Sequence, residues 1–105
     1  MGNFVAVAKT SDLEDGDMKQ IKLEGGMKLV VANVSGQFLA FGWECMHTSG
    51  APLADGWLDG EEVECPWHGG RYNVHTGEAT QFPAFGQIPT YAVRVEGEDI
   101  EVEIP

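Results

Sequence analysis

Two short cysteine–histidine pairs, separated by 17 residues, constrain this chain more than any other feature. The first pair is Cys45 and His47, and the second pair is Cys65 and His68. Thiolate and imidazole are ligands that iron–sulfur clusters and zinc both select. Side chains two positions apart point to different sides of a helix, so the first pair is expected on a loop around a metal rather than on a helix.

The second pair is also expected on a loop, because its neighbours interrupt regular structure. Pro66 follows the cysteine, fixes its own φ angle and lacks a backbone N–H donor. Gly69 and Gly70 follow the histidine, and glycine allows positive φ angles and a close approach of the backbone to inorganic sulfur. The sequence therefore predicts two loops that together hold one metal group.

The overall charge narrows the range of partners. The chain has 17 acidic and 6 basic residues, a formal net charge of -11. Such a surface repels nucleic acid and anionic lipid, so neither is an expected partner. The charge would suit a protein partner with a basic patch, although simple solubility explains it equally well.

The N-terminal residues and the cysteine content indicate the cellular compartment. The chain starts without a basic segment followed by an apolar run, and no apolar run approaches membrane-spanning length. If both cysteines bind metal, neither is left for a structural disulfide, which suits a reducing compartment. We therefore expect a cytoplasmic protein without a membrane anchor.

Period-two alternation of apolar and polar residues predicts an all-β fold of antiparallel strands. Its clearest example is the end of the chain, where alternation over 91–96 and 100–104 predicts a hairpin with one solvated face. Further strands are expected at 4–9, 18–23, 27–34, 37–43, 57–58, 62–64 and 71–74. A hairpin turn is expected at Ser35-Gly36, a short helical turn near Ser11, and an extended loop between Pro83 and Pro89. The length of 105 residues predicts a single domain, 1–105.

Other chemistry-bearing residues are interpreted as structural. His75 lies beside a turn and is expected at the surface. The aromatic residues are expected to pack in the core or in loops; they include Phe38, Phe41, Trp43, Trp57 and Phe85. The acidic pairs Asp15/Asp17, Glu61/Glu62 and Glu98/Asp99 are interpreted as solvated turns. No catalytic triad, phosphate-binding glycine motif or substrate pocket is indicated.

The two pairs and their flanks resemble the Rieske 2Fe-2S signature. The flanks are His-Thr-Ser-Gly-Ala-Pro-Leu at 47–53 and Cys-Pro-Trp-His-Gly-Gly at 65–70, with Thr-Gly-Glu at 76–78 and Phe-Pro-Ala at 82–84. The similarity covers most of the chain, whose length matches the small ferredoxins of aromatic-ring dioxygenase systems. It implies the Rieske fold, an antiparallel β-sandwich with a cluster-binding subdomain of hairpin loops at about 43–75.

The resemblance also implies the cofactor and its ligands. One 2Fe-2S cluster would be bound by Cys45 and Cys65 on one iron and by His47 and His68 on the outer iron. Members of high reduction potential carry a serine and a tyrosine soon after the second histidine, and both donate hydrogen bonds to cluster sulfurs. This chain has Gly70 at the serine position but keeps a tyrosine, Tyr72, as a possible donor. The membrane-anchored Rieske subunits of respiratory complexes also carry an extra cysteine pair bridging the loops, which is absent here. We therefore predict a potential at the low end of the Rieske range of roughly −150 to +300 mV.

Three residues beside the ligands bear on partner contact. Met46, Pro52 and Trp67 could form an apolar rim where an electron leaves through the histidine edges, or they could serve only to pack the loops.

The function implied by the resemblance is that of an electron carrier without substrate chemistry of its own. It would pass single electrons from a flavin-containing, NAD(P)H-dependent reductase to the terminal oxygenase of an aromatic-ring-hydroxylating dioxygenase. The biphenyl, toluene, naphthalene and carbazole systems are examples, and a free carrier is expected to be a monomer. Two alternatives remain: a small Rieske subunit of an assimilatory nitrite reductase, and a structural zinc module. The zinc module usually has Cys-x2–4-Cys and His-x3–5-His spacings rather than mixed pairs.

Overall fold

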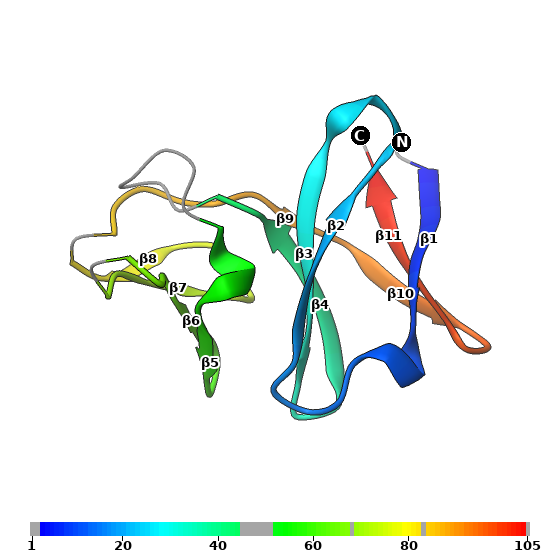
Figure 1. Cartoon of the computed structure of the whole chain (residues 1–105), viewed down its shortest axis with the longest axis horizontal. Helices are drawn as coiled ribbons and strands as arrows, with labels where there is room; N and C mark the ends of the chain where they lie inside the picture. The colour runs from blue at the N-terminus through cyan, green and yellow to red at the C-terminus, as the bar shows by residue number, and fades with distance from the viewer. Residues whose placement is uncertain (1–2, 45–51, 68, 83, 105) are drawn as a thin grey trace.

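A computed structural model describes residues 3–44, 52–67, 69–82 and 84–104, and it consists of three antiparallel sheets (Figure 1). The first sheet has the strand order β1-β11-β10, the second β2-β3-β4-β9 and the third β5-β6-β7-β8. The strands of the first sheet are β1 (Asn3–Lys9), β10 (Val93–Glu96) and β11 (Asp99–Ile104). Those of the second are β2 (Met18–Lys22), β3 (Lys28–Val34), β4 (Gln37–Gly42) and β9 (Thr90–Tyr91). Those of the third are β5 (Trp57–Asp59), β6 (Glu62–Glu64), β7 (Arg71–Asn73) and β8 (Ala79–Gln81).

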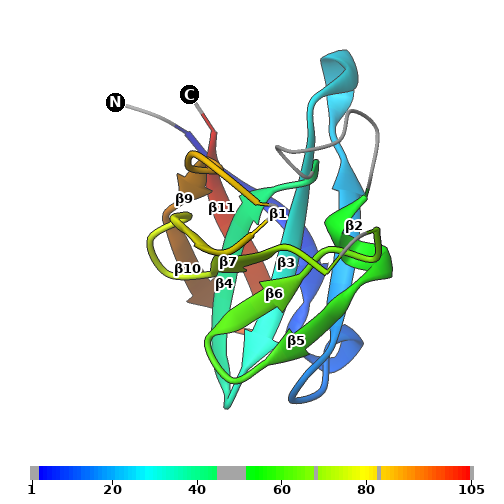
Figure 2. The same cartoon turned by 90° about the vertical axis from the view of Figure 1, so that its left-hand side faces the viewer.

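The second sheet lies between the other two, and its strand β3 is buried on both faces (Figures 1 and 2). Leu29 and Val31 of β3 belong to the core shared with the first sheet, which includes residues of β11. Val30 and Ala32 alternate with them and belong to the core shared with the third sheet. This double burial explains why β3 is an almost continuous apolar run. The third sheet is thereby fixed to the rest of the chain by hydrophobic packing.

The expected strands and turns are largely confirmed. Ser35 and Gly36 connect β3 to β4 with φ angles of 54° and 90°, as a primed hairpin turn requires. The C-terminal hairpin pairs Val93 with Val102 and Glu96 with Asp99. Its first strand is shorter than the predicted 91–96, because Tyr91 pairs with Ala40 in the second sheet instead. A 3₁₀ turn at Thr10–Asp12 confirms the helical turn expected near Ser11. The described residues thus confirm the all-β, antiparallel prediction, and they contain no helix long and apolar enough to cross a membrane.

The strand β8 was not predicted. Its three residues show no useful alternation, and it pairs with β7 through an irregular register, Arg71 with Gln81 and Tyr72 with Ala79. Pairing with a neighbouring strand, rather than local sequence, therefore creates β8.

Candidate metal centre

Three connecting segments meet at one end of the third sheet. β5 begins at Trp57, which pairs with Glu64 at the end of β6. Glu64 also pairs with Arg71 at the start of β7, and Arg71 pairs with Gln81 at the end of β8. The segments that precede β5, join β6 to β7 and follow β8 therefore share this end (Figures 1 and 2). We call it the ligand end, because the segment between β6 and β7 carries the second cysteine–histidine pair.

The segment that carries the first pair is held at both of its ends. The backbone N–H of Leu53 donates to the Trp43 carbonyl over 2.8 Å, and Glu44 and Pro52 form an isolated antiparallel bridge. The chain positions on either side of this segment are therefore side by side. Cys45, Met46 and His47 themselves lie outside the described residues.

Gly56, just before β5, packs against the chain at the start of the second segment. A Cβ atom at Gly56 would lie 1.9 Å from the carbonyl oxygen of Glu64, which directly precedes Cys65. Only glycine can approach this carbonyl so closely. Gly56 therefore lets the end of the first segment pack directly against the start of the second.

Cys65 is the one expected ligand that the structure describes, since His68 also lies outside the described residues. Its side chain is fully buried in the core that also contains Leu53, Val63 and Tyr72. Its backbone N–H donates to the Gly70 carbonyl over 2.7 Å, which closes the base of the 65–70 segment. A thiol enclosed in this way, with a donor set of two cysteines and two histidines in the chain, fits a buried iron of a 2Fe-2S cluster. The described part of the chain contains no group of three or more histidine, cysteine and acidic side chains placed to hold a metal.

The segment after β8 packs against the 65–70 segment. The Gln81 side-chain amide donates to the Gly69 carbonyl over 3.0 Å, and a Cβ atom at Gly70 would lie 2.8 Å from the Ala84 backbone nitrogen. Gly70 is the position at which Rieske chains of high potential carry serine. The close approach of Ala84 leaves no space there for a side chain without movement of the backbone.

Tyr72 was expected as a possible hydrogen-bond donor to a cluster sulfur. Its side chain is fully buried, and its hydroxyl lies 3.4 Å from the Phe85 carbonyl oxygen. A contact of this length is weak, and it directs the hydroxyl toward the segment after β8. The role of Tyr72 toward a cluster stays a prediction.

Large aromatic side chains are exposed at the ligand end and along the segment after β8. Phe82 is 89% exposed, Phe85 58% and Trp67 45%. The expectation that Phe85 packs in the core or a loop is therefore wrong, and Trp57 is likewise exposed. Phe82, Phe85 and Trp67 lie in connecting segments, where periodicity gives no information about burial, and Trp57 is the first residue of the short strand β5.

The other aromatic expectations are confirmed. Phe41 is fully buried, and Phe38 and Trp43 pack against the two cores as partly buried residues. Lys28 lies over the Trp43 ring, with its Nζ 4.5 Å from the ring centroid. Pro52 is half-buried, so it contributes partly to loop packing.

His75 lies in the turn between β7 and β8, at the end of the third sheet opposite the ligand end. It is a surface residue, as expected, and its Nε2 lies 3.0 Å from Glu61 Oε1. It therefore lies away from the end of the sheet that carries Cys65.

Several acidic residues are more than solvated turn residues. Asp99 pairs with Lys9, Asp17 accepts from the Glu14 backbone N–H, and Glu62 contacts Arg71. Arg71 was not singled out from the sequence. A signal was present, because Glu64 and Arg71 carry opposite charges on the two sides of the second pair, as cross-strand partners do.

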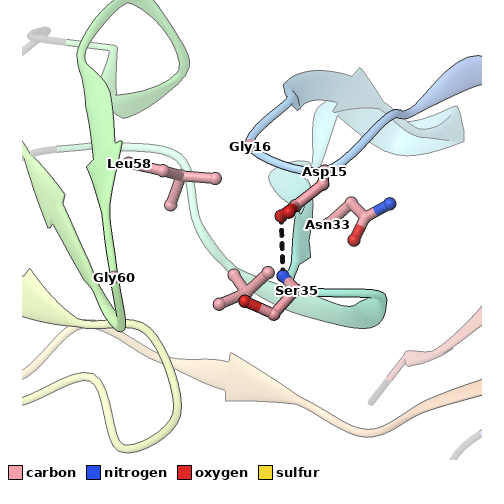
Figure 3. A pocket seen from close by; sticks show the side chains of 7 residues that line it. Asp15, Gly16, Asn33, Ser35, Leu58 and Gly60 are labelled. Carbon is pink, nitrogen blue, oxygen red and sulfur yellow. Dashed lines mark hydrogen bonds between the residues drawn. The ribbon is translucent and has the colours of Figure 1, made fainter.

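A polar hollow lies between the second and third sheets, at the end of β5 and β6 opposite the ligand end (Figure 3). It is lined by Asp15, Gly16, Asn33, Val34, Ser35, Leu58 and Gly60. The Asp15 carboxylate already accepts a hydrogen bond from the Ser35 backbone N–H over 2.8 Å. The hollow is therefore separate from the candidate metal centre.

Comparison with known proteins agrees with this geometry. Residues 3–92 match the Rieske [2Fe-2S] domain. The ferredoxin component of the p-cumate 2,3-dioxygenase system of Pseudomonas putida is 36% identical over 97% of this chain and 86% of its own length. Human apoptosis-inducing factor 3 is 39% identical over 92% of this chain, but the matched part is only 16% of that protein.

Solved structures show the same fold. The ferredoxin of Sphingomonas yanoikuyae B1 has a TM-score of 0.91 and 33% identity, covering 98% of this chain and 100% of that one. A chain in the complex of reduced oxygenase and oxidized ferredoxin of carbazole 1,9a-dioxygenase has a TM-score of 0.89 and 33% identity. The match covers 95% of this chain and 92% of that one. With a family match over most of its length and ferredoxin relatives above 30% identity, the chain belongs to the Rieske [2Fe-2S] domain family.

Proposed function

We propose that this protein is a single-domain electron carrier, 1–105, whose 2Fe-2S cluster is bound in the loops at about 43–75. Cys45 and Cys65 bind one iron, and His47 and His68 bind the other. The observation that carries the proposal is Cys65, a fully buried thiol at the base of a segment that also contains a histidine. The cluster supplies reversible one-electron chemistry at these ligands.

The described residues bury Cys65, and we propose that electrons are exchanged on the histidine side. Cys65 is fully buried in the same core cluster as Leu53, Val63 and Tyr72, which keeps water from its sulfur. Two neutral imidazoles make the site less negative than four thiolates would, which raises the reduction potential relative to all-cysteine sites. Because Gly70 cannot supply a hydroxyl donor, we place the potential at the low end of the Rieske range.

The partners follow from the relatives' names. The p-cumate relative is a ferredoxin component of a dioxygenase system, and the carbazole relative is a ferredoxin in a complex with its oxygenase. We propose that this chain accepts electrons from a flavin-containing, NAD(P)H-dependent reductase and passes them to the terminal oxygenase of an aromatic-ring-hydroxylating dioxygenase. It acts as a monomeric cytoplasmic carrier and performs no substrate chemistry.

The exposed aromatic residues support docking at the ligand end. Phe82 lies directly after β8, and Trp67 lies between the two expected ligands of the second pair. Exposed rings are costly in water and favour a surface that is covered in a complex. The 17 acidic residues of the chain favour a partner whose docking face is basic.

The test is an absorption and low-temperature EPR spectrum of the purified protein before and after anaerobic reduction. A red-brown protein whose reduced form gives a broad anisotropic signal, averaging below the free-electron value, would support mixed cysteine and histidine ligation. A second arm measures NAD(P)H-dependent turnover of a purified terminal oxygenase with and without this protein. A colourless, EPR-silent sample containing one zinc per chain would overturn the proposal.

A further inference from the structure

A single arginine at the ligand end contacts three carboxylates. Arg71 Nη1 lies 2.8 Å from Asp59 Oδ2 and 3.3 Å from Glu62 Oε1. Its Nη2 and Nε lie 2.8 Å and 3.1 Å from the same oxygen, Oε1 of Glu64. The guanidinium therefore links β7 to both β5 and β6.

The network differs from an ordinary surface ion pair. The Arg71 side chain is only 24% exposed, and those of Glu64 and Glu62 are 28% and 34% exposed. The guanidinium presents several N–H groups in fixed directions, so it can bind several carboxylate oxygens at once. The hydrogen bonds that Arg71 donates to Asp59, then Glu64 and Glu62, raise its pKa further above its ordinary value, so the residue stays charged at any physiological pH.

The position of Arg71 connects the network to the second pair. Arg71 and Glu64 are cross-strand partners, and the next hydrogen-bonded pair along the ladder is Cys65 N–H to the Gly70 carbonyl. Glu64 and Arg71 are thus the cross-strand pair that immediately flanks the segment containing Cys65 and His68. Loosening their contact would release the backbone that orients Cys65.

The network also affects the local charge. Asp59, Glu62 and Glu64 share one cation, so the group carries a net charge of about −2 when all three are ionised. Removing the cation leaves three neighbouring negative charges, of which the Glu64 carboxylate belongs to the residue directly before Cys65. Added negative charge near a redox centre stabilises its oxidised form and lowers its reduction potential.

We propose that Arg71 is a positioning residue for the cluster: it fixes the base of the 65–70 segment and offsets the carboxylate charge beside it. This inference rests on the proposed function, because it takes Cys65 and His68 as cluster ligands. It assigns to Arg71 two separable effects, one on retention of the cluster and one on its reduction potential.

The experiment compares Arg71→Gln with Arg94→Gln in the full-length, cluster-loaded protein. Arg94 is a matched control, since its Nε lies 2.7 Å from its cross-strand partner Glu101, and its loss changes the net charge equally. It lies in the C-terminal hairpin of the first sheet, a different sheet from the one that carries the second pair. The rate of cluster loss to an iron chelator, the midpoint potential and the EPR signal are measured for both variants.

We expect Arg71→Gln to lose its cluster about 10-fold faster, the low end of the effect found for groups that orient metal ligands. Its midpoint potential should shift to more negative values, while Arg94→Gln matches the wild type in both measurements. Arg71→Lys retains the charge but not the fork of N–H groups, so it should restore most of the potential and only part of the cluster retention.

Glu64→Gln provides a second variant should Arg71→Gln fail to fold. It weakens the same link but removes a negative charge, so cluster loss should accelerate while the potential shifts to more positive values. Cluster loss and potential indistinguishable between Arg71→Gln and Arg94→Gln would overturn the inference, as would shifts of the same sign for Glu64→Gln and Arg71→Gln. A wild-type protein without a Rieske EPR signal would instead reject the proposed function, so the two failures are distinguishable.

Discussion

Gly77 is the position at which a single added methyl group should be most informative. It has a φ angle of +82°, its N–H donates to the Asn73 carbonyl over 2.8 Å, and its carbonyl accepts from the Ile88 N–H over 2.8 Å. A Cβ atom there would lie 2.1 Å from the Ile88 carbonyl oxygen. Gly77→Ala therefore combines an unfavourable backbone conformation with a collision against the backbone of a buried residue.

The expected cost can be worked out from these contacts. The left-handed conformation costs an alanine about 1–2 kcal/mol. Relieving the collision costs roughly 1–3 kcal/mol, as overpacking does. It also weakens the hydrogen bond between Gly77 and Ile88, which contributes about 0.5–1.5 kcal/mol. Together these three terms should lower the free energy of unfolding by at least about 2.5 kcal/mol. Gly16→Ala is the matched control, because Gly16 has a φ angle of +91° but nothing within 4 Å of its Cβ position; it should cost only about 1–2 kcal/mol.

The assay is denaturant unfolding and thermal melting of both variants, compared at equal cluster content because a bound cofactor can break two-state behaviour. For a domain of this size 1 kcal/mol corresponds to about 4–8 °C in Tm. The free energies of unfolding of the two variants should differ by at least roughly 1.5 kcal/mol, so Gly77→Ala should melt at least about 6 °C below Gly16→Ala. Equal free energies of unfolding for the two variants would refute the argument from close approach.

Two further predictions follow from the described geometry. Gly70→Ser should lower the free energy of unfolding by about 1–3 kcal/mol, because its Cβ would meet the Ala84 backbone nitrogen at 2.8 Å; denaturant melts test this, and an unchanged stability would contradict it. Burial raises the pKa of Tyr91 above its ordinary value of about 10. Above that pH the unfolded chain loses the Tyr91 proton before the folded chain does, so stability should fall as pH rises, and less steeply in Tyr91→Phe. Equal slopes for the two proteins between pH 9 and 11 would reject the assignment.

Most of the fold was predictable from local patterns. Alternation at 91–96 and 100–104 placed the C-terminal hairpin, and Ser35-Gly36 placed the turn between β3 and β4. These features depend on residues within a few positions of one another, where side-chain period and turn chemistry dominate. The spacing of the cysteine–histidine pairs likewise predicted the family to which the chain belongs.

The parts that could not be predicted depend on contacts between distant segments. The strand β8 exists because β7 pairs with it, and the exposure of Phe82 and Phe85 depends on which loops cover them. A sequence pattern reports which side of an element is apolar but not whether another element covers it.

The sequence by itself determined the ligand set expected for the metal, the strand pattern and the acidic charge, since each is a property of residue identity and spacing. Only the tertiary structure decided that Gly70 lies against Ala84 and that three carboxylates from two strands converge on Arg71. Both depend on strand register and on the packing of separate segments at the ligand end. Register and packing are collective properties, because the buried surface that fixes them is contributed by the whole sheet and not by any one stretch of the chain.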